Sequence, residues 1–227
     1  MPPNKAVSAT EDTEVATSYN FSHDDAVTLV VGPEKTKMTV HGAYLARDLE
    51  FFKAALKKEW VEGQTQVIKL PEEDPKTMAH YMSFVYHNKL PFEHMIPKER
   101  RHFNARWPIL IDLYVCGERF IHHAIQNAVI EEMLRLTHLR CPKGLRWFPT
   151  GSIVAAIYEG TPVGSPIRRL IVDMHVIHGS KDWLSTNASA EFLMDVTKAF
   201  YDKSGHHNAQ SKLKKMELDS KDYVIDA

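Results

Sequence analysis

Histidine and cysteine are the residues of this sequence best suited to bind a metal or attack a substrate, but their spacing favours neither activity. His122 and His123 are adjacent, and adjacent helical residues point about 100° apart, so the two side chains diverge. No cysteine or carboxylate stands at an obvious ligand offset from them. His206 and His207 lie in a polar tail, and Cys116 lies in an apolar helical pattern typical of a small buried residue. We therefore predict no metal site and no cysteine nucleophile.

Carboxylates and sequence motifs do not indicate an enzyme either. Glu131 and Glu132 are adjacent on a predicted helix, so they cannot act jointly as acid and base. The patterns GxGxxG, GxxxxGK[ST], HExxH and GxSxG are all absent. His41, between a predicted strand and a predicted helix, is expected to hydrogen-bond a neighbouring backbone group. The sequence predicts no catalytic residues, no cofactor and no enzymatic activity.

Charge and composition exclude several classes of partner. The 227 residues include 28 Lys and Arg against 29 Asp and Glu, a net charge of -1, which gives no general attraction to nucleic acid or anionic lipid. The two cysteines are too few for a disulfide scaffold. The chain has no signal-peptide pattern, and no apolar run approaches the ~18 residues that a membrane span requires. We expect an intracellular protein, cytoplasmic or nuclear, that binds neither nucleic acid nor membrane.

The elements that would position any site begin with a strand, a turn, a strand and a helix. Residues 27–31 form a β-branched run closed by Gly32-Pro33, and residues 37–41 alternate with Met38 and Val40 on one face. The period then changes from two to about 3.6. A third strand is expected at residues 66–70. Together these predict a small three-stranded sheet.

The first predicted helix carries two apolar ridges, so it needs two neighbours. One ridge holds Leu45, Leu49, Phe52 and Leu56, and the other holds Tyr44, Phe51 and Ala55. The second ridge is either core or an interface with a second copy. As an interface, its two aromatic rings would contribute ~3 to 5 kcal/mol by area transfer, against association costs of comparable size. That alternative corresponds to a weak homodimer.

Helices dominate the rest of the chain. We expect Trp60 to cover the edge of the core, Gly63 to turn the chain, and Asp74-Pro75 to begin the next helix. Residues 87–97 predict an irregular loop with a short edge strand. Further helices are predicted at residues 104–117, after Gly117, at 152–158, after Ser165-Pro166 and around Phe192 to Phe200. Early strands followed by helices predict an α+β domain with a helical extension.

Both ends of the chain are expected to be disordered, because polar stretches bury too little surface to offset their ordering entropy. These stretches are residues 1–20 and residues 203–219. Tyr223, Val224 and Ile225 are apolar enough to dock on the folded part. The sequence does not indicate where.

A basic cluster overlaps the start of the helix predicted at residues 104–117. It contains Lys98, Arg100, Arg101 and Arg106 with only Glu99 opposing, so four positive charges minus one leave a local charge near +3. This is either a solvated helix face or a patch for an acidic partner segment. No aromatic-interleaved groove or reading helix accompanies it, which disfavours nucleic acid.

An ordered set of residues resembles the BTB/POZ domain. The set comprises residues 25–32, Val40-His41, Leu45, residues 51–56, Trp60, Glu62, Leu70-Pro71 and Val85-Tyr86, within a region from about Phe21 to Leu134. The helices beyond it resemble the tail of short fungal members, best at residues 165–170. The resemblance implies a disordered lead at 1–20, a BTB/POZ domain at 21–136, a helical extension at 137–202 and a mostly disordered tail at 203–227.

The resemblance implies a protein-interaction module without catalytic residues. Members of the family homodimerise, act as substrate adaptors on cullin ubiquitin-ligase scaffolds, or recruit transcriptional corepressors. A cullin adaptor is the first hypothesis, and a transcriptional or chromatin regulator is the alternative. The residues expected to bind partners are Leu90, Phe92, Glu93, Tyr44 and Phe51.

Three departures from the family pattern affect these expectations. Residues 1–20 lack the extra strand and helix that transcription-factor members exchange between subunits. Cullin-docking members often carry an apolar-x-Glu motif, but here Phe92 and Glu93 are adjacent. Leu49 stands where the family usually has Ser, and we expect it to improve packing.

Overall fold

The computed structural model describes residues 25–92, 97, 99–140, 144, 146–184, 188–204 and 217–225. Its strands are β1 (Ala26–Val31), β2 (Thr36–His41) and β3 (Val67–Leu70). Its α-helices are α1 (Gly42–Asp48), α2 (Glu50–Ala55), α3 (Val61–Thr65), α4 (Pro75–His87), α5 (Arg100–Phe120), α6 (His123–His138), α7 (Ser152–Gly160), α8 (Pro166–His178) and α9 (Ala190–Ser204). Two short 3-10 turns, η2 (Lys181–Trp183) and η3 (Ser220–Tyr223), complete the elements.

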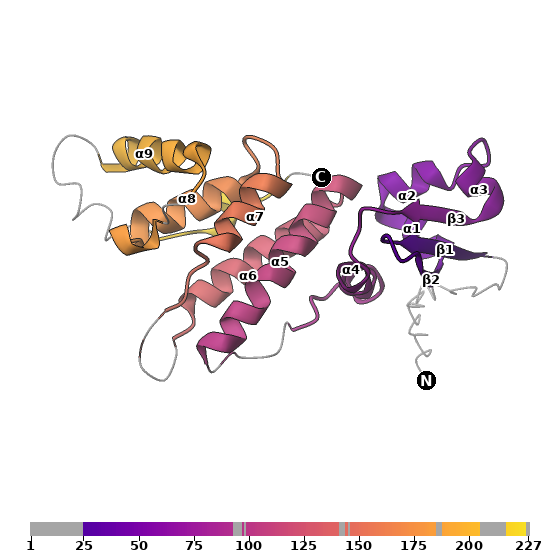
Figure 1. Cartoon of the computed structure of the whole chain (residues 1–227), viewed down its shortest axis with the longest axis horizontal. Coiled ribbons are helices and arrows are strands. Elements are labelled where there is room, and N and C mark those ends of the chain that lie inside the picture. The colour runs from indigo at the N-terminus through magenta and orange to yellow at the C-terminus, as the bar shows by residue number, and fades with distance from the viewer. Residues whose placement is uncertain are drawn as a thin grey trace, which may run out of the picture.

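The three strands form one small mixed sheet at one end of the molecule (Figure 1). Strand β1 is central, antiparallel to β2 and parallel to β3. Val27, Leu29 and Val31, alternate residues of β1, are fully buried, which fixes the register because a one-residue slip would expose all three. The predicted three strands are confirmed, each to within one residue at its ends.

The prediction of one helix that runs to Leu56 is wrong, because the helix is interrupted at Leu49. Leu49 has an extended backbone (φ −116°, ψ 93°) that separates α1 from α2. The break still buries Leu45, Leu49 and Phe52 in one core. Hydrophobic spacing identified the buried face, but it could not detect a turn that preserves that face.

The connector after α2 also differs from expectation. Trp60 does not cover the core edge, since 59% of its surface is exposed. Residues after it form the short helix α3, which contains Gly63. A Cβ on Gly63 would collide with the backbone of Lys57, so this close approach requires glycine.

Helix α4 begins as predicted, at Asp74-Pro75. The Asp74 carboxylate accepts a hydrogen bond from the Thr77 backbone N–H at 2.8 Å, and this bond lowers the pKa of Asp74. Pro75 occupies the first turn, where its missing N–H costs nothing. In Figure 1, α4 lies between the sheet and the α5–α6 pair.

Helices α5 and α6 pack closely as an antiparallel pair (Figure 1). The break expected at Gly117 is wrong: α5 continues to Phe120, and Ile121 ends it in the left-handed conformation (φ 54°, ψ 50°). A Cβ on Gly117 would lie 2.7 Å from the side chain of Gln126 and 2.8 Å from that of Ile125. Gly117 is therefore a contact point between the two helices. Ile121 is 60% exposed and does not join the buried face of α6.

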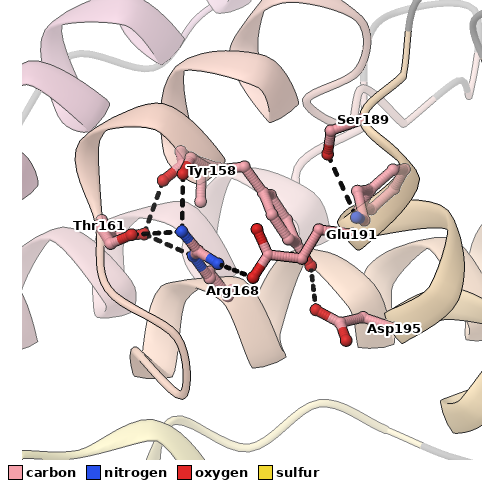
Figure 2. A network of polar contacts seen from close by, with 8 residues as sticks. Tyr158, Thr161, Arg168, Ser189, Glu191 and Asp195 are labelled. Carbon is pink, nitrogen blue, oxygen red and sulfur yellow. Dashed lines mark hydrogen bonds and ion pairs between the residues drawn. The ribbon is translucent and has the colours of Figure 1, made fainter.

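The last three α-helices are joined by the buried side chain of Arg168, on α8 (Figure 2). Its guanidinium donates to the backbone oxygen of Tyr158 at 2.6 Å, to the hydroxyl of Thr161 at 3.0 Å and to the backbone oxygen of Thr161. It also pairs with Glu191 on α9 at 2.7 Å. One side chain thus holds α7, α8 and α9 together.

The end of the chain returns to the helices. Residues 203 and 204, predicted to be disordered, complete α9, and residues 217–225 pack against α6 and α8 through η3. The expected docking of Tyr223 takes place there, with 3% of its surface exposed. Residues 1–20, Cys141, His206 and His207 lie outside the described residues.

The architecture is α+β, with a small sheet packed on helical hairpins and an α-helical extension beyond them. Its buried apolar residues form one cluster that runs from the sheet to η3. Within the part of the chain that the structure describes, no helix has the length and apolar character to cross a bilayer.

Candidate functional site

Cys116 is a buried thiol whose surroundings do not favour a nucleophile. Cys116 is 1% exposed, and its Sγ donates a hydrogen bond to the Glu73 carboxylate at 3.5 Å. Burial, with the negative charge of Glu73, raises the pKa of the thiol far above neutral pH. Glu73 in turn pairs with Arg119 at 2.6 Å. Cys116 remains a buried thiol, as the sequence predicts.

Two of the histidines singled out above, His41 and His122, have tyrosine partners. The Nδ1 atom of buried His122 lies 3.0 Å from the Tyr81 hydroxyl. The backbone N–H of His41 donates to the Tyr86 hydroxyl at 2.9 Å, and its Nδ1 lies 3.0 Å from the same oxygen. His41 therefore has the predicted structural role, with the Tyr86 side chain as a partner. Among the described residues, no three His, Cys, Asp or Glu side chains gather as metal ligands.

A groove between the end of α4 and one face of α6 is the best candidate for a binding site. Its volume is about 410 Å³. It lies over the start of the 87–97 loop that the sequence indicates as a partner surface. The residues that line it are Phe84, Asn88, Lys89, Leu90, Ala124, Asn127, Ala128, Glu131, Glu132 and Arg135.

The α4 side of the groove depends on how the helix ends. Asn88 adopts the left-handed conformation (φ 51°, ψ 35°), and its backbone N–H donates to the Phe84 oxygen at 2.7 Å. Asparagine tolerates this conformation better than most residues. The chain then turns so that Leu90 and Phe92 point inward.

Two of the three predicted partner-binding residues of this loop, Leu90 and Phe92, are buried in their own chain. Leu90 and Phe92 are each 7% exposed and belong to the core cluster. Leu90 lines the groove, Phe92 packs against Arg106, and neither side chain forms a protruding contact. No edge strand occurs at residues 88–92, and Glu93 lies outside the described residues.

A buried ion-pair network forms the base of the groove. Glu132, 5% exposed, lies 3.5 Å from the guanidinium of Arg106 and accepts bonds from Arg135 at 2.5 and 2.8 Å. The Arg106 guanidinium also lies 5.1 Å from the centre of the Phe92 ring. Burial lowers the pKa of Arg106, and the charge of Glu132 opposes that change. The network fixes α6 and the loop to α5.

The buried position of Arg106 removes this residue from the basic surface cluster predicted around residues 98–106. Arg106 is 6% exposed and faces the core, so it cannot contribute to a surface patch. Arg101 pairs with Glu99 at 2.9 Å, with both side chains mostly exposed. Lys98 lies outside the described residues.

The α6 side of the groove is shaped by small residues. Ala124 is exposed and Ala128 half-buried, one helical turn apart, so no bulky side chain fills the space between them and α4. Lys89 and Glu131 place opposite charges on the rim. An α6 wall of small apolar residues with a charged rim suits a polypeptide segment, because it offers apolar contact and charge complementarity together.

The other two predicted partner-binding residues occupy separate surroundings. Tyr44 stacks on Tyr86, with ring centres 4.7 Å apart, and the Arg47 guanidinium lies over its ring. Phe51, 36% exposed, packs on Phe120 at 5.1 Å. The break at Leu49 divides the ridge that was expected to hold both, and neither residue lines the α4–α6 groove.

Sequence reasoning missed the α6 half of the groove. Ala124, Asn127 and Ala128 lie 27 to 31 residues beyond the end of the 87–97 loop, and nothing local marks them. The spacing of Ala124 and Ala128 by four residues was the available signal. It could not be distinguished from two alanines in a core face.

Comparison with known proteins bears on the first part of the chain. A family model for the BTB/POZ domain matches residues 20–102. A search of curated proteins finds no match to the chain. The matched region contains the whole sheet, α1 to α4 and the loop that begins the groove. The chain thus combines a BTB/POZ fold with an α-helical extension, and the match supports a protein–protein interaction module.

Proposed function

We propose that the chain is a docking module that binds a partner protein in the α4–α6 groove, and that this partner is a cullin scaffold, so that the chain acts as a ubiquitin-ligase substrate adaptor. The groove itself carries the proposal. It lies where the BTB/POZ-type unit meets the next helices, and its charged rim and the small residues on its α6 side suit a polypeptide segment.

The domain limits belong to the same proposal. The family match ends at residue 102, but Gly117 allows α5 and α6 to pack too closely to be independent units. We therefore place the end of the BTB/POZ unit near residue 136, in the last turn of α6, with the helical extension at 137–202. That extension is similar to the tail of short fungal members.

A pulldown with two tryptophan variants tests the groove. Ala124→Trp places a large ring in the groove from an exposed position, so it blocks the site without overpacking the core. Ala79→Trp is the matched control, because Ala79 is an exposed alanine of α4 that does not line the groove. The unmodified chain and Ala79→Trp should recover the partner from lysate of the source cell, and Ala124→Trp should not.

Mass spectrometry of the recovered proteins separates the two levels of the proposal. A cullin that is lost from Ala124→Trp supports the adaptor role. Another stoichiometric partner that is lost in the same way supports the groove but rejects the cullin. Recovery that is equal from all three proteins would reject the groove.

A further inference from the structure

The C-terminal segment is held on α6 by a two-point contact to its backbone. The Asn127 side-chain oxygen accepts from the Ile225 N–H at 2.9 Å, and the Asn127 amide nitrogen donates to the Ile225 carbonyl at 3.0 Å. Both polar groups of one residue's backbone are therefore satisfied by one side chain. Such a contact recognises extended backbone whatever the side chain of the bound residue.

The second contact recognises a side chain. The Tyr223 hydroxyl donates to the Asp173 carboxylate at 2.7 Å, and the other oxygen of Asp173 lies 3.2 Å from the ammonium of Lys203. Tyr223 is 3% exposed. A buried tyrosine ring with its hydroxyl paired to a carboxylate gives a large apolar contact with a directional end.

Exposure alternates along residues 223–225. Tyr223 is buried, Val224 is 45% exposed with extended backbone (φ −63°, ψ 140°), and Ile225 is half-buried. Upstream, Leu218 packs on the core. Alternating inward and outward residues, with both backbone and side-chain recognition, are how grooves bind extended peptides.

We propose that the α6–α8 surface is a peptide-binding site for a Tyr-x-aliphatic segment, that the chain's own residues 223–225 occupy it, and that a partner protein with a segment of this type displaces them. The recognition elements are Asn127 for the backbone and Asp173 for the tyrosine hydroxyl, and the half-buried Ile225 marks the aliphatic position. Asn127 also lines the α4–α6 groove, so the two sites adjoin.

Because the chain's own segment occupies the site, it sets a minimum affinity that a partner segment needs in order to bind. A segment on the same polypeptide has an effective concentration of about millimolar when its connection is short. A competing segment of equal intrinsic affinity therefore binds only weakly until the internal segment is weakened. The internal segment would restrict the site to partners that bind more tightly than it does.

A fluorescein-labelled peptide with the sequence of residues 217–227 tests the site by fluorescence anisotropy. Full-length Tyr223→Ala/Ile225→Ala has a weakened internal segment and an unchanged surface. It should bind the peptide about 10- to 100-fold more tightly than the unmodified chain. Adding Asn127→Ala to that variant should abolish binding, and a peptide with Tyr223→Ala should not bind. Should the double variant not fold, as judged by its thermal unfolding, Tyr223→Phe replaces it with the same expected order of affinities.

Three results of the anisotropy experiment would contradict the peptide-binding proposal. No binding to a folded variant at millimolar peptide, equal affinity for the variant and the unmodified chain, or binding that persists with Asn127→Ala would each overturn the proposal. The Ala124→Trp pulldown does not alter residues that contact the segment, so failure of one proposal is distinguishable from failure of the other.

Discussion

Glu132 has the strongest individual influence on the groove, because two arginines depend on it. Arg106 is buried and Arg135 is half-exposed, and both contact this one carboxylate. The sequence showed Glu131 and Glu132 only as an adjacent pair. Burial separates their roles: Glu131 is on the rim, and Glu132 is in the base.

Glu132→Ala should lower the free energy of unfolding by about 3 to 5 kcal/mol, since it removes a buried carboxylate that contacts the guanidinium groups of both Arg106 and Arg135. Glu131→Ala, at the adjacent exposed position, should change it by less than about 0.5 kcal/mol. Urea unfolding of the two variants measures the difference. Equal stabilities would mean that the network does not support the groove.

His175 makes stability depend on pH. The residue is 6% exposed between the rings of Trp183 and Phe192, and its Nδ1–H donates to the Ile171 carbonyl at 2.8 Å. Burial lowers the pKa of His175 below its usual 6.5. Below about pH 6.5 the unfolded chain therefore takes up a proton that the folded chain does not.

The free energy of unfolding should thus fall as the pH drops below about 6.5 and be insensitive to this group above it. His175→Leu should reduce that fall, and His87→Gln, at the exposed end of α4, should not. Urea unfolding at pH 7.5 and pH 5.5 provides the measurement. An unchanged pH dependence in His175→Leu would show that His175 is protonated in the folded protein.

At the scale of elements, Arg168 decides whether α7, α8 and α9 move as one. Its four hydrogen-bonding contacts reach two backbone oxygens, a hydroxyl and a carboxylate, as Figure 2 shows. The ring of Tyr158 lies 4.5 Å from its guanidinium, and the Tyr158 hydroxyl donates to Asp195 on α9. The contacts to Glu191 and Asp195 give α9 two polar attachments.

Arg168→Leu should lower the free energy of unfolding by about 3 kcal/mol, because buried carbonyls of Tyr158 and Thr161 lose their donor. Amide hydrogen exchange in α9 should accelerate most. Arg169→Leu, at the next and exposed position, is the matched control and should leave both measurements nearly unchanged. Uniform acceleration across every helix would contradict a role confined to the extension.

The sequence predicted elements better than it predicted their breaks. A β-branched run found the first strand, alternation found the second, and the Asp74-Pro75 signal found the start of α4. Leu49 and Gly117 misled the prediction in opposite ways: a break occurs where the apolar stripe continues, and a helix continues through a glycine. The α4–α6 groove was only half predictable, because the contact of α6 with the end of α4 is set by tertiary packing.

At the scale of the molecule, the sheet and the helical extension lie at opposite ends, with α4 to α6 between them (Figure 1). Phe51 is an exposed apolar residue near the sheet, and we propose from the sequence that it contributes to a weak homodimer. Its limited exposed area predicts weak self-association, with a Kd above about 10 μM.

Light scattering coupled to size-exclusion chromatography over rising concentration measures this association. Phe51→Gln should weaken it, and Val163→Gln, at an 83% exposed position before α8, should not. A stable dimer that is insensitive to Phe51→Gln would place the interface elsewhere.

The most direct test of the docking account is a calorimetric titration of the purified partner, first a cullin, into the unmodified chain, Ala124→Trp and Ala79→Trp. The account predicts micromolar or tighter binding to the unmodified chain and to Ala79→Trp, and binding at least about 10-fold weaker to Ala124→Trp. One affinity shared by all three proteins would contradict it.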